Sequence, residues 1–167
     1  YGFIERDLFL AALDGGHFPE KEVILTFDDG FSDHIRYVVP ELMKRNIWGL
    51  FYVSTGPYVN GRMLNVHRIH CLLGQYGGAS MWAALQGLLS GEMISASRKA
   101  AFENAVYRRQ QNDNETLLFK KTLNYFLDES WRGPILDRLV HQYLDEPRLL
   151  AEHYLSIPDI AELQRCG

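Results

Sequence analysis

The order of apolar and polar positions predicts two strands joined by a helix near the start of the chain. Residues 23–27 form a short run of β-branched and aromatic residues between glycine and proline signals, which is typical of a strand buried on both faces. Residues 48–54 predict a second strand of the same kind. A strand, a helix and a strand with short links predict one βαβ unit over residues 20–57, in which the two strands are parallel.

Helices are expected on both sides of the first strand. A short helix is predicted over residues 3–13. The helix between the strands is expected to run to about Lys44, with Ser32 or Asp33 as its capping residue. Because proline lacks a backbone N–H, Pro40 should kink this helix or begin a second helical segment.

The middle of the chain has a different pattern. Over residues 65–153 the apolar residues recur at helical spacing, and strand signals are almost absent. Turn signals divide the region into about five helices. They lie at residues 77–78, 90–91, 112–114 and 133–134. A further helix is expected to begin at Pro158, because proline is favoured in the first helical turn.

Composition places the chain among ordinary globular domains. Of its 167 residues 47% are hydrophobic and 23% charged, so disorder and a disulfide scaffold are not expected. The net charge of −4 gives no electrostatic reason to expect nucleic-acid binding. No apolar run approaches the roughly 20 residues of a membrane span. Cys71 and Cys166 leave the redox compartment open, and no leader peptide is visible in the chain.

The chemistry of the sequence is concentrated in two neighbouring acids, Asp28 and Asp29, at the end of the first predicted strand. Adjacent carboxylates repel one another, and a protein tolerates them where a cation binds or where a base is needed. Successive strand residues point to opposite sides, so the two acids should have different roles. Gly30 would allow a sharp turn beside a ligand. The alternative interpretation, in which both acids serve only the turn and the helix cap, stays open.

These residues resemble a known family. Residues 23–31, with the sequence VILTFDDGF, are similar to the first motif of the polysaccharide deacetylases, which form the NodB-homology group or carbohydrate esterase family 4. The following helix and the strand at residues 49–53 resemble the family's next elements, and residues 154–167 resemble the helix before its second motif. The resemblance therefore covers residues 20–57 and 154–167.

The resemblance implies a fold and an activity. The fold is α/β: a single truncated deacetylase-like domain over residues 1–167 that forms the N-terminal part of a deformed (β/α) barrel. Residues 65–153 would be a largely helical insertion. The activity is that of a metal-dependent hydrolase that removes N-acetyl groups from a polysaccharide or glycan. Asp28 would be the catalytic base and Asp29 a ligand of the metal, usually zinc. The other ligands, a His-x-x-x-His motif, are expected beyond Gly167.

Two other classes of function stay open. The chain is alternatively a catalytically inactive deacetylase-like module that binds carbohydrate or another partner. A nucleotide-sugar transferase with an acidic metal pair is a third interpretation, although such sites favour Asp-x-Asp spacing over adjacent aspartates. The compartment and the oligomeric state are not indicated by the sequence.

Several other residue patterns have simpler interpretations. His67 and His70 are three residues apart on a predicted helix, which favours a helix surface over a metal site. His34 is expected to be an exposed helix residue, with a supporting role at the site as the alternative. The remaining patterns are predicted to be solvated helix faces (residues 108–109 and 120–121), a helix boundary (residues 131–134) and core aromatics (Tyr37, Trp48, Phe51 and Tyr52).

Overall fold

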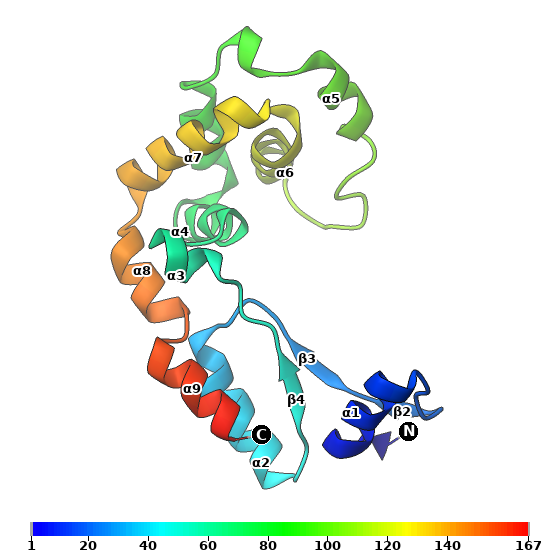
Figure 1. Ribbon diagram of the computed structural model, residues 1–167. Helices are drawn as coiled ribbons and strands as arrows, with labels where there is room; N and C mark the ends of the chain where they lie inside the picture. Colours follow the sequence, from blue (N-terminus) through cyan, green and yellow to red (C-terminus); the bar gives the residue numbers. More distant parts are fainter. Residues whose placement is uncertain (1, 167) are drawn as a thin grey trace. The chain divides into compact units, whose positions relative to one another are not determined.

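The computed structural model describes residues 2–166 and divides the chain into two compact units (Figure 1). Unit 1 contains the residues up to Arg62 and those from Pro147 onward, so it is formed by two separate parts of the chain. Unit 2 is continuous and contains Met63–Glu146. Unit 1 combines strands and helices and unit 2 is helical, so the chain as a whole is mixed α/β and mostly helical.

Unit 1 contains two parallel strand pairs. Strand β1 (Gly2–Phe3) pairs with β2 (Glu22–Val23), and β3 (Leu25–Phe27) pairs with β4 (Gly49–Phe51). The predicted parallel pair is therefore confirmed as β3 and β4. The single strand expected over residues 23–27 is divided, because its first part pairs with β1 and its second part with β4.

The expectation that this strand is buried on both faces is wrong. Thr26 in the middle of β3 is exposed, whereas Leu25 and Phe27 are half-buried. A parallel sheet buries both faces only when helices or further strands cover them, and within residues 2–166 the sheet of β3 and β4 has two strands. The face that carries Phe27 is covered and the face that carries Thr26 is open.

A glycine allows β3 and β4 to pack closely on the covered face. A Cβ atom at Gly49 would lie 2.9 Å from the ring of Phe27 and 3.2 Å from the carbonyl oxygen of Leu25. Without that atom, the rings of Phe27 and Phe51 stack at a centroid distance of 4.9 Å. A larger residue at position 49 would therefore displace the strand that ends at the predicted site.

Proline lies in the first turn of several helices of unit 1. Its helices are α1 (Arg6–Gly15), the π-helical turn η1 (His34–Val38), α2 (Val39–Lys44), α3 (Gly56–Asn60), α8 (Glu146–His153) and α9 (Ile157–Arg165). Pro40 lies in the first turn of α2 and Pro158 in the first turn of α9, so both predictions are confirmed. The predicted cap at Ser32 or Asp33 is wrong. Asp33 makes no capping bond, and the hydroxyl of Ser32 donates to the carbonyl of Glu152 instead.

Unit 2 is a helical bundle. Its helices are α4 (Asn65–Gln86), η2 (Gly91–Met93), α5 (Ala96–Phe102), α6 (Asn114–Lys121), the π-helical turn η3 (Thr122–Phe126) and α7 (Glu129–Tyr143). The turn predicted at residues 77–78 appears as a kink in α4, where Gly77 has φ 76° and ψ 162°. The boundary predicted at residues 131–134 is wrong, because Pro134 lies inside α7. The residues that follow Pro134 are buried in the core, and that packing outweighs the hydrogen bond that proline removes.

The core of unit 2 is densely apolar. It is formed by buried side chains of α4, α6, η3, α7 and the residue after η3: Ile69, Leu72, Met81, Leu85, Phe119, Leu123, Leu127, Ile135, Leu136, Leu139 and Val140. Lys120 is also buried, with its ammonium 2.6 Å from the side-chain oxygen of Gln110 and 4.6 Å from the ring centre of Tyr107. The prediction of a solvated face is therefore wrong for Lys120, because its cation is held by a ring and an amide.

A buried arginine ties the helices of unit 2 together. The side chain of Arg68 on α4 is 3% exposed, and its Nη2 donates to Oδ1 of Asp137 on α7 at 2.8 Å. Its Nη1 donates to Oδ1 of Asn65 at 3.1 Å. Its Nε lies 3.1 Å from Oε1 of Glu146, but the N–H is not directed at that oxygen, so this contact is an ion pair without a hydrogen bond. The same Oε1 accepts the backbone N–H of Met63 at 3.0 Å. The charge of Arg68 is thus balanced by two acids, Asp137 within α7 and Glu146 at the end of the unit.

Candidate functional site

The two adjacent acids lie in a strained turn at the carboxyl end of β3. We call residues 28–30 the acidic turn. Asp29 has φ 69° and Gly30 has φ 67°, so two consecutive residues adopt the left-handed region. This conformation costs free energy for every residue except glycine, and aspartate and asparagine tolerate it best among the others. A Cβ atom at Gly30 would also lie 3.0 Å from Cγ1 of Val53, so the position requires glycine. Such strain is characteristic of functional sites.

The turn places its two carboxylates in different surroundings. Asp28 is exposed to solvent. Asp29 is half-buried, and its Oδ1 accepts a hydrogen bond of 3.2 Å from the hydroxyl of Ser54, which lies shortly after the end of β4. Because β3 and β4 are parallel, their carboxyl ends meet at one edge of the sheet, and this is where α/β proteins place their sites. The two acids, for which the sequence predicts different roles, therefore have different surroundings.

A distant part of the chain holds the acidic turn in place. The backbone N–H of Leu155 donates to the carbonyl of Gly30 at 2.9 Å, and the hydroxyl of Tyr58 donates to the carbonyl of Leu155 at 3.0 Å. The Ser32 hydroxyl donates to the carbonyl of Glu152 at 2.7 Å. Residues 152–155 therefore hold Gly30 and the residues just after the acidic turn by hydrogen bonds. Sequence reasoning missed this contact, because the partners are separated by up to 120 residues.

A buried histidine supports the turn on the covered face of the sheet. His34 is 7% exposed, and its ring packs against the rings of Phe27 at 5.7 Å, Phe31 at 6.0 Å and Phe51 at 5.6 Å between centroids. Phe27 and Phe31 flank the acidic turn, so this imidazole contacts both of its ends. The prediction of an exposed helix residue is wrong, because the π-helical turn η1 directs His34 toward the sheet.

The electrostatic surroundings of His34 favour its neutral form. Burial lowers the pKa of His34 below its ordinary value of 6.5, although the nearby carboxylates of Asp33, Asp28 and Asp29 act in the opposite direction. Its Nδ1 is buried and has no hydrogen-bond partner within residues 2–166. His34 is therefore close enough to the acidic turn to experience its charge, although the sequence predicted it to be an exposed helix residue.

His67 and His70, for which the sequence favours a helix surface over a metal site, do not belong to the acidic turn. His67 and His70 are on α4 in unit 2, and burial together with the charge of Lys120 lowers the pKa of His70. Within the part of the chain that the structure describes, no group of three or more His, Cys, Asp or Glu side chains could hold a metal ion. The structure brings Asp28 and Asp29 to one turn, and it does not complete a metal site around them within these residues.

Two of the aromatic residues expected in the core are at the surface. Tyr52, which follows β4, is 56% exposed, and Tyr37 on η1 is 65% exposed. Trp48 and Phe51 are half-buried. The core prediction is therefore wrong for Tyr52 and Tyr37. Alternation along the strand would have placed Tyr52 on the face opposite Phe51, and this is the signal that could have identified it.

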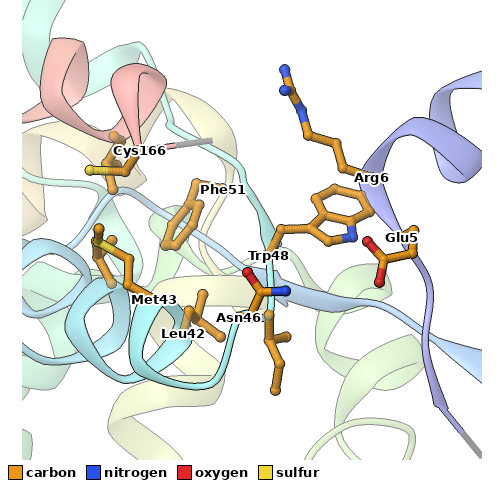
Figure 2. A pocket seen from close by; sticks show the side chains of 12 residues that line it. Glu5, Arg6, Leu42, Met43, Asn46, Trp48, Phe51 and Cys166 are labelled. Atoms are coloured by element: carbon orange, nitrogen blue, oxygen red, sulfur yellow. The ribbon is translucent and has the colours of Figure 1, made fainter.

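A separate cavity of about 330 Å³ lies along β4, from Trp48 to Phe51 (Figure 2). It has a floor of Leu42 and Phe51, and Trp48 lies beside Glu5 and Arg6 at its edge. The indole N–H of Trp48 donates to the carbonyl of Ile4. Neither predicted site residue lines this cavity. None of the residues of the acidic turn lines it, so the cavity is distinct from that turn.

The chain was also compared with known proteins. No protein-family model matches it. No curated protein and no solved structure matches it either. Among the described residues, none of the helices has the length and hydrophobicity that crossing a membrane requires.

Proposed function

We propose that the chain belongs to a metal-dependent hydrolase that removes N-acetyl groups from a polysaccharide or glycan. The observation that carries this proposal is the acidic turn, in which one carboxylate is exposed and its neighbour is half-buried and hydrogen-bonded. A hydrolytic site needs a base that can reach water and a second acid with a separate task. The resemblance of residues 23–31 to the first motif of the polysaccharide deacetylases supplies the substrate class.

In this proposal Asp28 is the general base. Its exposed carboxylate takes a proton from the water molecule whose oxygen attacks the carbonyl carbon of the N-acetyl group. The C–N bond then breaks, the nitrogen leaves with a proton, and the products are acetate and a free amine on the sugar. The rigid anchoring of the turn by residues 152–155 supports this role, because a base must be held at a fixed distance from its substrate.

Asp29 is proposed to be a ligand of a zinc ion or another divalent metal. Catalytic zinc sites use about three protein ligands. Residues 2–166 do not supply such a group, so these residues alone do not fit a zinc site. We propose that the remaining ligands lie beyond residue 167, and no step of the reaction is assigned to the metal. The hydrogen bond from Ser54 holds the Asp29 carboxylate in one orientation, which is what a metal ligand requires.

The proposed fold is the N-terminal part of a deformed (β/α) barrel. The parallel pair of β3 and β4, with a helix between them, supports this proposal. The segments that carry the resemblance, residues 20–57 and 154–167, belong to unit 1, and most of the proposed insertion forms unit 2. Within residues 2–166 the sheet of β3 and β4 has two strands, so its outer edges are where further parallel strands of such a barrel would pair.

The test is acetate release from N-acetylglucosamine oligosaccharides by the full-length protein. We expect Asp28→Asn to lower turnover by about 100-fold or more while bound metal is retained. Asp29→Asn should remove the metal as well as the activity. Asp33→Asn is the matched control, because it makes the same change in a nearby exposed acid and should leave both unchanged.

Metal content is measured on the same samples by mass spectrometry of the purified proteins. Equal metal retention in the Asp28 and Asp29 variants would contradict the division of roles. Oligosaccharide binding without any acetate release in the wild-type protein would instead support the alternative, an inactive deacetylase-like module.

A further inference from the structure

An exposed aromatic ring lies beside the proposed base. Phe27 and Phe51 are paired in register, and their rings stack on the covered face with an interplanar angle of 18°. The backbone N–H of Tyr52 donates to the carbonyl of Phe27 at 2.8 Å, so the pairing of the two strands continues to this residue. Asp28 and Tyr52 are therefore the next residues in register.

Alternation along the strands places these two side chains on the same face. Since Phe27 and Phe51 occupy the covered face, Asp28 and Tyr52 leave the sheet on the open face. The exposure of the side chains agrees: Thr26, Asp28 and Tyr52 are all exposed. Neighbouring parallel strands are about 4.8 Å apart, so the pairing places the backbones of Tyr52 and Asp28 at about this distance, with both side chains on the open face.

We propose that Tyr52 is a substrate-binding residue whose ring stacks on the apolar face of the sugar unit that carries the N-acetyl group. This inference rests on the proposed function, because it takes the ligand to be an N-acetylated glycan. An aromatic face carries partial negative charge and attracts the C–H groups of a sugar ring. A ring at this position would hold the sugar beside Asp28, which would bring the acetyl carbonyl within reach of the base.

The geometry distinguishes Tyr52 from Tyr37, another exposed tyrosine among the described residues of the same unit. Tyr37 is 65% exposed, but it belongs to the helical turn η1 and is not in register with the acidic turn. It therefore provides a matched control of the same residue type and similar exposure. Exposure alone would make the two tyrosines equivalent, whereas the strand register makes only Tyr52 a neighbour of Asp28.

The experiment measures kcat and KM for N-acetylglucosamine oligosaccharides in the full-length protein. Tyr52→Ala should raise KM about tenfold with kcat changed less than about twofold, because the ring binds the sugar without taking part in the reaction. Tyr52→Phe retains the ring and should keep both constants within about twofold. Tyr37→Ala should leave both unchanged. Tyr52→Leu repeats the loss of the ring with less change in volume, and thermal unfolding verifies that each variant is folded.

A measurement of oligosaccharide binding that does not depend on turnover separates this inference from the proposed function. Chemical-shift titration with the oligosaccharide is carried out in the Asp28→Asn background, where turnover is expected to be about 100-fold slower or more. Weaker binding in the Tyr52→Ala and Tyr52→Leu variants supports the inference, even where the wild-type protein releases no acetate and the proposed function fails. Acetate release with the same KM in wild type, Tyr52→Ala and Tyr52→Leu would overturn the inference and leave the proposed function intact.

Discussion

The two units of the chain are stabilised in different ways. Of the largest side chains that are fully buried within residues 2–166, all but Leu155 belong to unit 2. Most of the large apolar side chains that the described residues leave exposed belong to unit 1. Unit 2 therefore has a core of its own, whereas unit 1 depends on short strand pairs and on hydrogen bonds between distant segments.

The residues of the proposed site and most of the fully buried apolar side chains therefore belong to different units. The acidic turn and Tyr52 are in unit 1, where the backbone is strained and little apolar surface is buried. Strained and exposed groups are typical of sites, because a site must present polar atoms to a ligand instead of satisfying them internally. Substitutions in the core of unit 2 should therefore cost more stability than substitutions at the acidic turn of unit 1.

The largest effect is expected in the core of unit 2. Phe119→Ala should lower the free energy of unfolding of unit 2 by about 4 kcal/mol, because Phe119 is completely buried and the change leaves a cavity. Phe18→Ala in unit 1, where the side chain is 47% exposed, should cost under about 1 kcal/mol. Urea denaturation measures both. Fluorescence in a Trp48→Phe background reports on unit 2, because Trp82 and Trp131 both belong to it. Similar losses in the two variants would contradict the comparison.

The next effect concerns the buried arginine. Arg68→Met should destabilise unit 2 by about 3 kcal/mol, because it leaves the mostly buried carboxylate of Glu146 without its cation. Adding Glu146→Gln removes that charge and should recover part of the loss. The same urea titration measures the single and double variants. If the double variant is no more stable than Arg68→Met alone, Arg68 does not balance the charge of Glu146.

A smaller effect is expected at the acidic turn. Gly30→Ala should destabilise unit 1 by about 2 kcal/mol, because the new Cβ meets Val53 in a left-handed backbone. Gly16→Ala is the matched control. Gly16 has φ 70° with no atom within 4 Å of the new Cβ, so only the backbone cost of about 1 kcal/mol applies. Thermal unfolding followed through Trp48 fluorescence, in a background in which Trp82 and Trp131 are replaced by phenylalanine, compares the two. An equal loss in both would show that Val53 moves away without cost.

The smallest effect is that of pH on unit 1. Because burial lowers the pKa of His34 in the folded chain, the unfolded chain binds this proton more readily. Stability should therefore be complete above the ordinary value of 6.5 and decrease as the pH falls through 6.5 toward the lower value of the folded state. The carboxylates of Asp33, Asp28 and Asp29 oppose the shift and reduce the effect.

Unfolding midpoints measured between about pH 5 and 7.5 test this prediction, and His34→Phe should flatten the dependence. His70 in unit 2 also has a lowered pKa, but it is exposed and should contribute less. An unchanged slope in His34→Phe would assign the pH dependence to another group.

The sequence predicted the features that depend on neighbouring residues. The parallel pairing of β3 and β4 and the helix starts at Pro40 and Pro158 follow from strand composition and proline chemistry. The position of the two acids after the first strand follows from the same local pattern. The features it predicted wrongly depend on what lies nearby in space. Pro134 continues a helix because its neighbours are buried, and Lys120 is buried because Tyr107 and Gln110 receive its cation.

At the candidate site too, the sequence predicted what depends on neighbouring residues and missed the contacts between distant ones. The sequence identified Asp28 and Asp29, but not the left-handed backbone of Asp29 or the serine that holds it. It also gave no indication that residues 152–155 anchor the turn, because the carbonyl and N–H groups that these residues contribute are present in the backbone whatever the side chain. These contacts follow from the path of the chain, which local patterns of hydrophobicity do not specify.

The hydrogen bond between the first and last residues of unit 2 has a practical consequence for engineering. Since the N–H of Met63 and the side chain of Glu146 are 3.0 Å apart, the segment leaves and returns at nearly the same point. A few flexible residues could bridge that gap, so the whole bundle is expected to be removable as a cassette, or replaceable by another domain with closely spaced ends.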